Sequence, residues 1–337
     1  MRNKMFILVL AFVILTSGRP TEAQQAGKVP RIGFLISASA EGIGSKSENY
    51  DATLRFIGAF RRGLRELGYV EGKNFVLEIR WGEAKRDRLS NLAAELVRLK
   101  VDLIVAEGGW AIRAAKKATR VIPIVMRMGS DPVKRGFVAS LAHPGGNITG
   151  MISLDTGLSG KRLELLAEMV PGVKRIAVLT SSGKFTARDE YKEMEAAARV
   201  LGVKLQVLKA RDANTIDSAF LAMSKERAEA LNVTPSIRFI QHLDRIRDLA
   251  TKNRLPSIHF HGTYVETGGL MSYGANVAAE YRRTARIVDK ILKGANPADL
   301  PVEQATTYEL VINLKTAKQL GIAIPPVMLM RADRVIR

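Results

Sequence analysis

Short runs rich in β-branched residues alternate with amphipathic segments along the chain, and the whole alternation occurs twice. The first series of apolar runs covers residues 31–36, 74–81, 102–107 and 122–128, and the second covers 175–181, 203–210, 228–235 and 255–262. Such alternation predicts parallel sheets with helices on both faces. Because one core rarely serves a chain of 337 residues, we predict an α/β protein of two doubly wound parallel-sheet lobes.

Three segments are predicted to cross between the lobes. "HPGGNITGM" (143–151) separates the two series, "GGLMSYG" (268–274) leads to a helix at 276–293 that returns to the first lobe, and residues 301–321 supply the third crossing. We expect lobe 1 to comprise residues 29–149 plus 275–302, and lobe 2 to comprise residues 150–274 plus 303–337. Glycine tolerates the backbone rotation that a hinge requires. The hinge candidates are Gly150, Gly268, Gly269 and Gly274, with ordinary turn glycines as the alternative.

The N-terminus has the pattern of a secretory signal peptide. Arg2 and Lys4 precede an apolar run at 5–16, and Thr21 and Ala23 form a small-x-small cleavage pattern. We predict a signal peptide at residues 1–23, with cleavage after Ala23, and a periplasmic product; a membrane anchor is the alternative. The chain has no cysteine, so neither disulfides nor a lipid on an N-terminal cysteine are expected. No stable membrane insertion is expected, and we expect a monomer.

The chain is strongly basic, with 52 lysines and arginines against 33 acidic residues and a formal net charge of +19. Its basic residues are scattered as helix-face pairs, such as Arg61/Arg62 and Arg282/Arg283, without interleaved aromatic residues. We therefore expect solvated helix faces and no nucleic-acid partner. A polyanion site, or long-range attraction to anionic ligands, is the alternative.

Ligands of open α/β sheets lie beyond the carboxyl ends of the strands, where helix N-termini offer free N–H groups. These ends supply the predicted ligand-binding residues of lobe 1: Ser37, Gly108, Gly109, Trp110, Ser130 and Asp131. The corresponding residues of lobe 2 are Thr180, Ser181, Thr234, His261, Tyr264 and Tyr273. Hydroxyl and backbone donors beside aromatic walls suit a small carboxylate-bearing solute such as an amino acid.

Several of these positions have a structural alternative. Asp131 or Glu107 would hold a ligand ammonium, but Asp131 also fits a helix cap before Pro132. Trp110 could stack on a ligand or cover the edge of its lobe. His259 and His261 share a strand face, yet no third ligand has an obvious spacing, so no metal site is predicted.

The sequence contains few motifs that would indicate catalysis. The chain has no Gly-Lys-Ser/Thr phosphate loop, no Gly-x-Ser-x-Gly elbow and no His-Glu-x-x-His motif, and without cysteine it has no thiol nucleophile. We expect a binding protein, not an enzyme, and no cofactor.

Long segments resemble a known family. "HPGGNITG", "GGLMSYG", "ILKGANPADLPVEQATTYELVINLKTAKQLGIAIPP" and the closing "RADRVI" are similar to the signature segments of the tryptophan/tyrosine-type (TrpX-like) substrate-binding proteins of ABC transporters. The resemblance covers residues 29–337. It implies a type I periplasmic binding protein fold of the Venus-flytrap kind, a small ligand held between the lobes by hinge closure, and an ABC permease of the inner membrane as partner. A ligand-sensing receptor without transport and a secreted two-lobed enzyme are the alternative functions.

Overall fold

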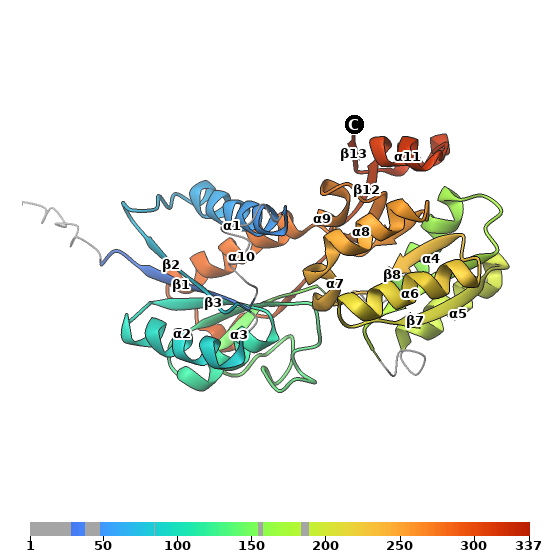
Figure 1. The fold of residues 1–337 in the computed structure, drawn as a ribbon. Coiled ribbons are helices and arrows are strands. Elements are labelled where there is room, and N and C mark those ends of the chain that lie inside the picture. The colour runs from blue at the N-terminus through green and yellow to red at the C-terminus, as the bar shows by residue number, and fades with distance from the viewer. Residues whose placement is uncertain (1–27, 38–47, 84, 154–157, 183–188) are drawn as a thin grey trace, which may run out of the picture.

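The computed structural model describes residues 28–37, 48–83, 85–153, 158–182 and 189–337. Its strands form two separate sheets, each wrapped by helices, and the chain passes between them (Figure 1). The predicted α/β architecture of two parallel-sheet lobes is confirmed. The predicted signal peptide lies outside the described residues.

The sheet of lobe 1 has six strands, all parallel, in the order β11-β5-β4-β3-β1-β2. The strands are β1 (Arg31–Ile36), β2 (Val76–Trp81), β3 (Leu103–Glu107), β4 (Ile124–Met128), β5 (Ile148–Ile152) and β11 (Glu303–Gln304). Its helices are α1 (Glu48–Glu66), α2 (Arg86–Arg98), α3 (Gly109–Ala118) and α10 (Val277–Leu292), with a short 3₁₀ turn, η2 (Pro297–Asp299).

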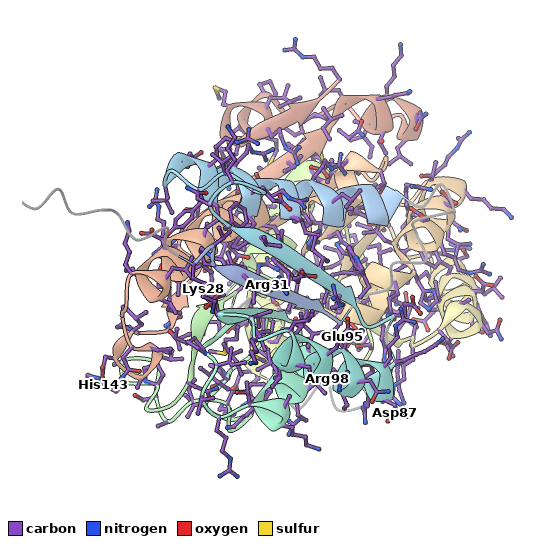
Figure 2. The ribbon with its side chains drawn as sticks, turned by 90° about the vertical axis from the view of Figure 1, so that its left-hand side faces the viewer. Lys28, Arg31, Asp87, Glu95, Arg98 and His143 are labelled. Carbon is purple, nitrogen blue, oxygen red and sulfur yellow. The ribbon has the colours of Figure 1, made fainter. Side chains whose placement is uncertain are left out.

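The helices of lobe 1 cover both faces of this sheet. α2 and α3 pack on one face, where Leu96 and Ile112 are buried with Leu35 and Ile104. α1 and α10 pack together on the other face around Phe34. Both faces of the sheet are thus sealed from water, as its nearly continuous apolar strands require. Figure 2 shows the outward face of α2, which carries Asp87, Glu95 and Arg98.

The sheet of lobe 2 has seven strands in the order β13-β12-β10-β9-β8-β6-β7. The pair β10–β12 is antiparallel, whereas the other neighbouring strands pair in parallel. The strands are β6 (Arg175–Thr180), β7 (Lys204–Lys209), β8 (Ala230–Val233), β9 (Ser257–His259), β10 (Met271–Ala275), β12 (Tyr308–Asn313) and β13 (Arg334–Ile336). Its helices are α4 (Leu158–Met169), α5 (Asp189–Leu201), α6 (Ala213–Lys225), α7 (Ile237–Gln241), α8 (Leu243–Lys252), α9 (Thr263–Glu266), α11 (Leu314–Leu320) and α12 (Pro326–Arg331). Two buried clusters, on opposite faces of this sheet, form its core.

The chain crosses between the lobes three times, after β5, after β10 and after β11. The crossings lie against one another: the Ala305 N–H donates to the Ile152 carbonyl at 2.9 Å, and the Asn276 N–H donates to the Thr307 carbonyl at 3.0 Å. Among the described residues these segments connect the lobes covalently, so we expect relative motion of the lobes to occur there.

The strand pairing moves the predicted lobe boundaries. β5 pairs with β4 along its whole length, with Gly150 opposite Met126 in the lobe 1 sheet, so lobe 1 continues through Ile152. β11 pairs with β5, so the later part of lobe 1 continues through Gln304. The first boundary was predicted too early because "NITGM" reads as a glycine-containing loop, although it forms a buried strand.

The placement of the four hinge candidates also corrects the sequence prediction. Gly150 sits inside a strand at φ 142°, where a Cβ would overlap the Met126 backbone. Gly268 and Gly269 precede β10, at the end remote from the crossing, and a Cβ on Gly269 would overlap the Tyr264 ring. Gly274 lies next to the crossing, but a Cβ there would overlap the Phe260 carbonyl. Gly150, Gly269 and Gly274 thus permit close packing, and we take the crossing residues near Asn276 and at 305–307 as hinge candidates in their place.

We expect Gly269→Ala to impair folding more than lobe closure. The added methyl group must displace the buried Tyr264 ring, so the free energy of unfolding should fall by about 1–3 kcal/mol. Gly146→Ala is the matched control, because its Cβ would meet nothing within 4 Å, and its effect should stay within about 0.5 kcal/mol. Urea denaturation measures both. Wild-type stability in Gly269→Ala would contradict this account and restore the hinge interpretation.

Candidate ligand-binding site

A cluster of charged and polar side chains lies at the carboxyl ends of the lobe 1 strands. Glu107 ends β3 and is opposite Arg127 of β4 in the sheet register. Arg127 donates from one terminal nitrogen to Glu107 at 2.9 Å and from the other to Glu280 of α10 at 2.6 Å. The Tyr281 hydroxyl donates to Glu107, and the Ser153 hydroxyl donates to Glu280. We call these five residues the charged cluster.

Burial within the charged cluster is uneven, and this decides which group can reach a ligand. The Glu280 side chain is 3% exposed and that of Arg127 is 12% exposed, whereas the Glu107 side chain is 24% exposed. Buried charges are stabilised only when they are paired and hydrogen-bonded, as these are. Glu107 is therefore the carboxylate of the cluster that a ligand can reach.

Two members of the charged cluster have shifted pKa values. Burial alone would lower the pKa of Arg127, but the attraction of the Tyr281, Glu280 and Glu107 oxygens outweighs burial and raises it. Burial, reinforced by the neighbouring Glu107 charge, raises the pKa of Tyr281 well above its usual value. At pH 7 Arg127 is therefore a cation and Tyr281 a neutral donor.

Aromatic rings extend from the charged cluster toward lobe 2. The Phe56 ring of α1 stacks on Tyr281 with 5.8 Å between centroids, and the Arg127 guanidinium lies 4.2 Å from the Tyr281 centroid. Phe56 also meets His261 of lobe 2 edge-to-face at 5.7 Å. Beside this contact, Arg55 of lobe 1 forms an ion pair with Glu266 of lobe 2 at 3.0 Å. The two lobes therefore meet at the aromatic side of the charged cluster.

The start of α3 supplies backbone donors next to Glu107. Gly108 adopts φ 85°, which favours glycine, and its N–H donates to the Arg127 carbonyl. The Ser37 hydroxyl accepts from the Ala111 N–H at 3.1 Å, and the Ile112 N–H donates to the Gly108 carbonyl. Within the described part of the chain this leaves the first-turn N–H groups of Gly109 and Trp110 available to an anion.

The remaining predicted residues of lobe 1 are Trp110, Asp131 and Ser130, and they differ in exposure and in hydrogen bonding. The Trp110 side chain is 41% exposed, and the Arg86 guanidinium lies 4.5 Å from its ring centroid, so it stands at the rim. Asp131 accepts from the N–H groups of Val133 and Lys134 at 2.9 and 3.1 Å, so it caps a turn at residues 132–136, not the predicted helix. Ser130 is partly buried directly before this cap.

In lobe 2 most of the predicted hydroxyl groups form hydrogen bonds within the lobe. Thr234 is buried and donates to the Leu179 carbonyl at 3.0 Å, while Thr180 accepts from the Ser182 N–H. The hydroxyl oxygens of Ser181 and Ser236 are 2.8 Å apart. The Thr234 and Ser181–Ser236 bonds join the ends of β6 and β8, whereas the Thr180 bond is local to the end of β6.

Tyr264 is corrected from a cleft wall to a core residue. Its side chain is 1% exposed, its hydroxyl is bonded to Ser257, and its ring stacks on His259 at 4.9 Å. Burial raises the pKa of Tyr264 to about 12. Tyr273 is partly buried, its ring lies 6.4 Å from that of Tyr308, and its carbonyl accepts from the buried Arg162.

Sequence reasoning missed the Ser153 hydroxyl, which follows β5, and four larger side chains: Phe56, Arg127, Glu280 and Tyr281. Arg127 had a signal, because it is the charged residue in the apolar run "IPIVMRM" and a charge inside a buried strand needs a partner. The other three lie on helices that were predicted, but which side of each helix faces the sheet could not be predicted from spacing alone.

Comparison with known proteins identifies the family. Residues 49–336 match the family described as "ABC transporter substrate binding protein". The chain belongs to this family. Among curated proteins it is similar to the "Tyrosine-binding protein" of Clostridioides difficile (strain R20291), with 25% identity over 264 residues, covering 77% of this chain and 75% of the relative.

Solved structures of similar proteins share the fold. An ABC domain from Streptococcus pneumoniae in complex with L-Trp matches at a TM-score of 0.74 and 27% identity, covering 91% of this chain and 99% of the other. A conserved domain protein from Vibrio cholerae matches at a TM-score of 0.76 and 27% identity, covering 91% and 100%. The recognition of a tryptophan/tyrosine-type family from sequence segments is confirmed.

None of the helices described is both long and apolar enough to cross a membrane. No group of three or more histidine, aspartate or glutamate residues in the described ranges is arranged to hold a metal ion.

His261 gives this substrate-binding protein a predictable pH response. Burial, with a smaller contribution from Arg127, lowers the pKa of His261 to about 4 from a usual value of 6.5. A lowered histidine pKa means that the unfolded chain binds the proton first, so stability is lost as pH falls from about 6.5 toward 4.

We expect His261→Gln to lose less stability than the wild type between pH 7 and pH 5. Because Gln cannot be protonated, the difference between the two losses should be about 1–2 kcal/mol. Urea denaturation at both pH values measures it, and His143→Gln, an exposed histidine at the surface, is the control. Equal losses in wild type and His261→Gln would contradict the lowered pKa.

Proposed function

We propose that this protein is the solute-binding component of an ABC import system and captures an aromatic amino acid in the cleft between its lobes. Family membership supports the general role. The L-Trp complex and the tyrosine-binding relative, which share 27% and 25% of their residues with this chain, support the ligand class. The observation that carries the proposal is the partly exposed Glu107 carboxylate, which Arg127 and Tyr281 orient beside aromatic rings.

Each part of an amino acid has a matching group in this site. The ligand ammonium is placed at Glu107, because a fixed carboxylate provides a strong charge-assisted hydrogen bond. The ligand carboxylate is placed at the free N–H groups of Gly109 and Trp110 in the first turn of α3, a helix of 10 residues. Glu107 and Gly109 are two residues apart, which suits two charged groups carried on one carbon atom.

The aromatic side chain of the ligand is placed against Phe56 and His261. Both rings are partly buried, and they approach each other from opposite lobes. A ligand ring there would contact both lobes at once, and binding would favour the arrangement in which they are close. The lobes would close by rotation at the three crossing segments, and the Arg55–Glu266 ion pair seen in this structure would stabilise the closed arrangement.

The cellular setting follows from the sequence features and the family. We propose export through a signal peptide that is cleaved after Ala23, a monomeric protein in the periplasm, and delivery of the solute to a permease of the inner membrane. The protein acts by binding alone, without catalysis, a cofactor or a nucleic-acid partner.

We expect purified protein to bind L-tyrosine or L-tryptophan, and ligand at a hundred times its dissociation constant to add about 2.7 kcal/mol to the free energy of unfolding. Glu107→Gln removes the charge that holds the ammonium and should weaken binding about tenfold or more. Isothermal titration calorimetry measures both affinities.

Glu71→Gln is the matched control for this substitution. Glu71 is also a lobe 1 carboxylate paired with an arginine, Arg61, but it follows α1 at the opposite end of the sheet. Its affinity should equal that of the wild type. Full affinity in Glu107→Gln, or no binding of either amino acid to the wild type, would contradict the proposed function.

A further inference from the structure

Arg127 is shared between two carboxylates that differ in what they can reach. One terminal nitrogen serves Glu107 and the other serves Glu280. Glu280 is almost fully buried and Glu107 is partly exposed, so of these two only Glu107 can touch a solute. A single arginine would suffice to neutralise Glu107, and the second carboxylate therefore requires an explanation.

The charges of the cluster sum to −1, because one guanidinium faces two carboxylates. His261 lies near Arg127, but its pKa is lowered to about 4, so it is neutral at pH 7 and leaves this sum unchanged. Without Glu280 the sum would be zero, and Arg127 would compensate Glu107 alone. The buried carboxylate thus sets whether the exposed one presents a net negative charge to the cleft.

Several contacts stabilise a negative charge on Glu280 despite its burial. Arg127 and the Ser153 hydroxyl both donate to its carboxylate. Glu280 also lies in the first turn of α10, where the helix dipole favours an anion. Its backbone is fixed as well, since its N–H donates to Asn276 and its carbonyl accepts from the Thr284 hydroxyl.

We propose that Glu280 is a specificity-determining residue that never touches the ligand. By engaging Arg127, Glu280 leaves Glu107 with a net negative charge. The cleft therefore selects solutes that carry an ammonium group over their deaminated analogues. This inference rests on the proposed function and extends it. It names Arg127 as the positioning residue through which the buried carboxylate acts. It also assigns the selected class as α-amino acids with aromatic side chains, as distinct from aromatic carboxylic acids.

The test compares two ligands on two variants by isothermal titration calorimetry. L-tyrosine carries the ammonium, and 3-(4-hydroxyphenyl)propanoate is the same molecule without it. Glu280→Gln keeps the shape of the side chain and removes the charge. Its amide oxygen can still accept from Arg127, while its amide N–H can donate to the Ser153 hydroxyl oxygen. We expect the ratio of the two affinities to fall about tenfold in Glu280→Gln, as expected for loss of one charge a few ångströms away in a partly buried site.

The control separates this effect from a structural one. Glu71→Gln should keep the wild-type ratio. An unchanged ratio in Glu280→Gln overturns the inference while leaving the proposed function intact.

One measurement uses only the wild-type protein, so it tests the inference even if the Glu280→Gln protein does not fold. Wild-type protein should bind L-tyrosine at least about tenfold more tightly than the deaminated analogue. Equal affinities for the two overturn the inference and the placement of the ligand ammonium at Glu107, and leave the general role as a solute-binding protein intact. Wild-type protein that binds neither L-tyrosine nor L-tryptophan overturns the proposed function and this inference with it.

Discussion

The pairing of Arg127 with two carboxylates is the interaction on which the candidate site depends. A guanidinium in the interior of a sheet is tolerated only if its charge is compensated, and here β3 supplies one carboxylate and α10 the other. α10 belongs to the returning part of the chain, which reaches lobe 1 only after the second crossing. The ion pairs therefore bind the two sequence-distant parts of lobe 1 to each other at the edge that faces lobe 2.

The same pairing links the site to the segments that connect the lobes. Ser153 follows β5 at the first crossing and donates to Glu280, which lies one turn after the second crossing. A change at Glu107 is thus connected through Arg127 and Glu280 to both crossings by direct hydrogen bonds. The partly exposed Glu107 carboxylate and the crossing segments are therefore connected through the same few side chains.

The fold was largely predictable because it follows from periodicity. Nearly continuous apolar runs separated by amphipathic segments allow few arrangements besides doubly wound parallel sheets, and both sheets were predicted. Errors arose at glycines: Gly150 and Gly269 suggested backbone freedom, whereas the structure uses them where no Cβ fits. A glycine needed for close packing and one needed for a hinge look alike in a single sequence.

The site was predictable only in part, for a different physical reason. The carboxyl ends of strands predicted Glu107 and the glycines that follow it as site residues, because topology alone brings those ends to one edge, and their role in binding stays a prediction. Tyr264 follows the same rule in sequence, yet it turns into the core to bond Ser257. Glu280 and Tyr281 enter the site from a helix whose orientation is set by packing against α1 through Gly63, a tertiary contact that no local pattern encodes.

The most direct test of the central claim is a crystal structure of the protein grown with L-tyrosine or L-tryptophan. We predict the amino acid between the lobes, its ammonium nitrogen within about 3.2 Å of the Glu107 carboxylate, and Arg127 still bonded to both Glu107 and Glu280. An amino acid bound elsewhere, or one whose ammonium faces away from Glu107, would contradict the account.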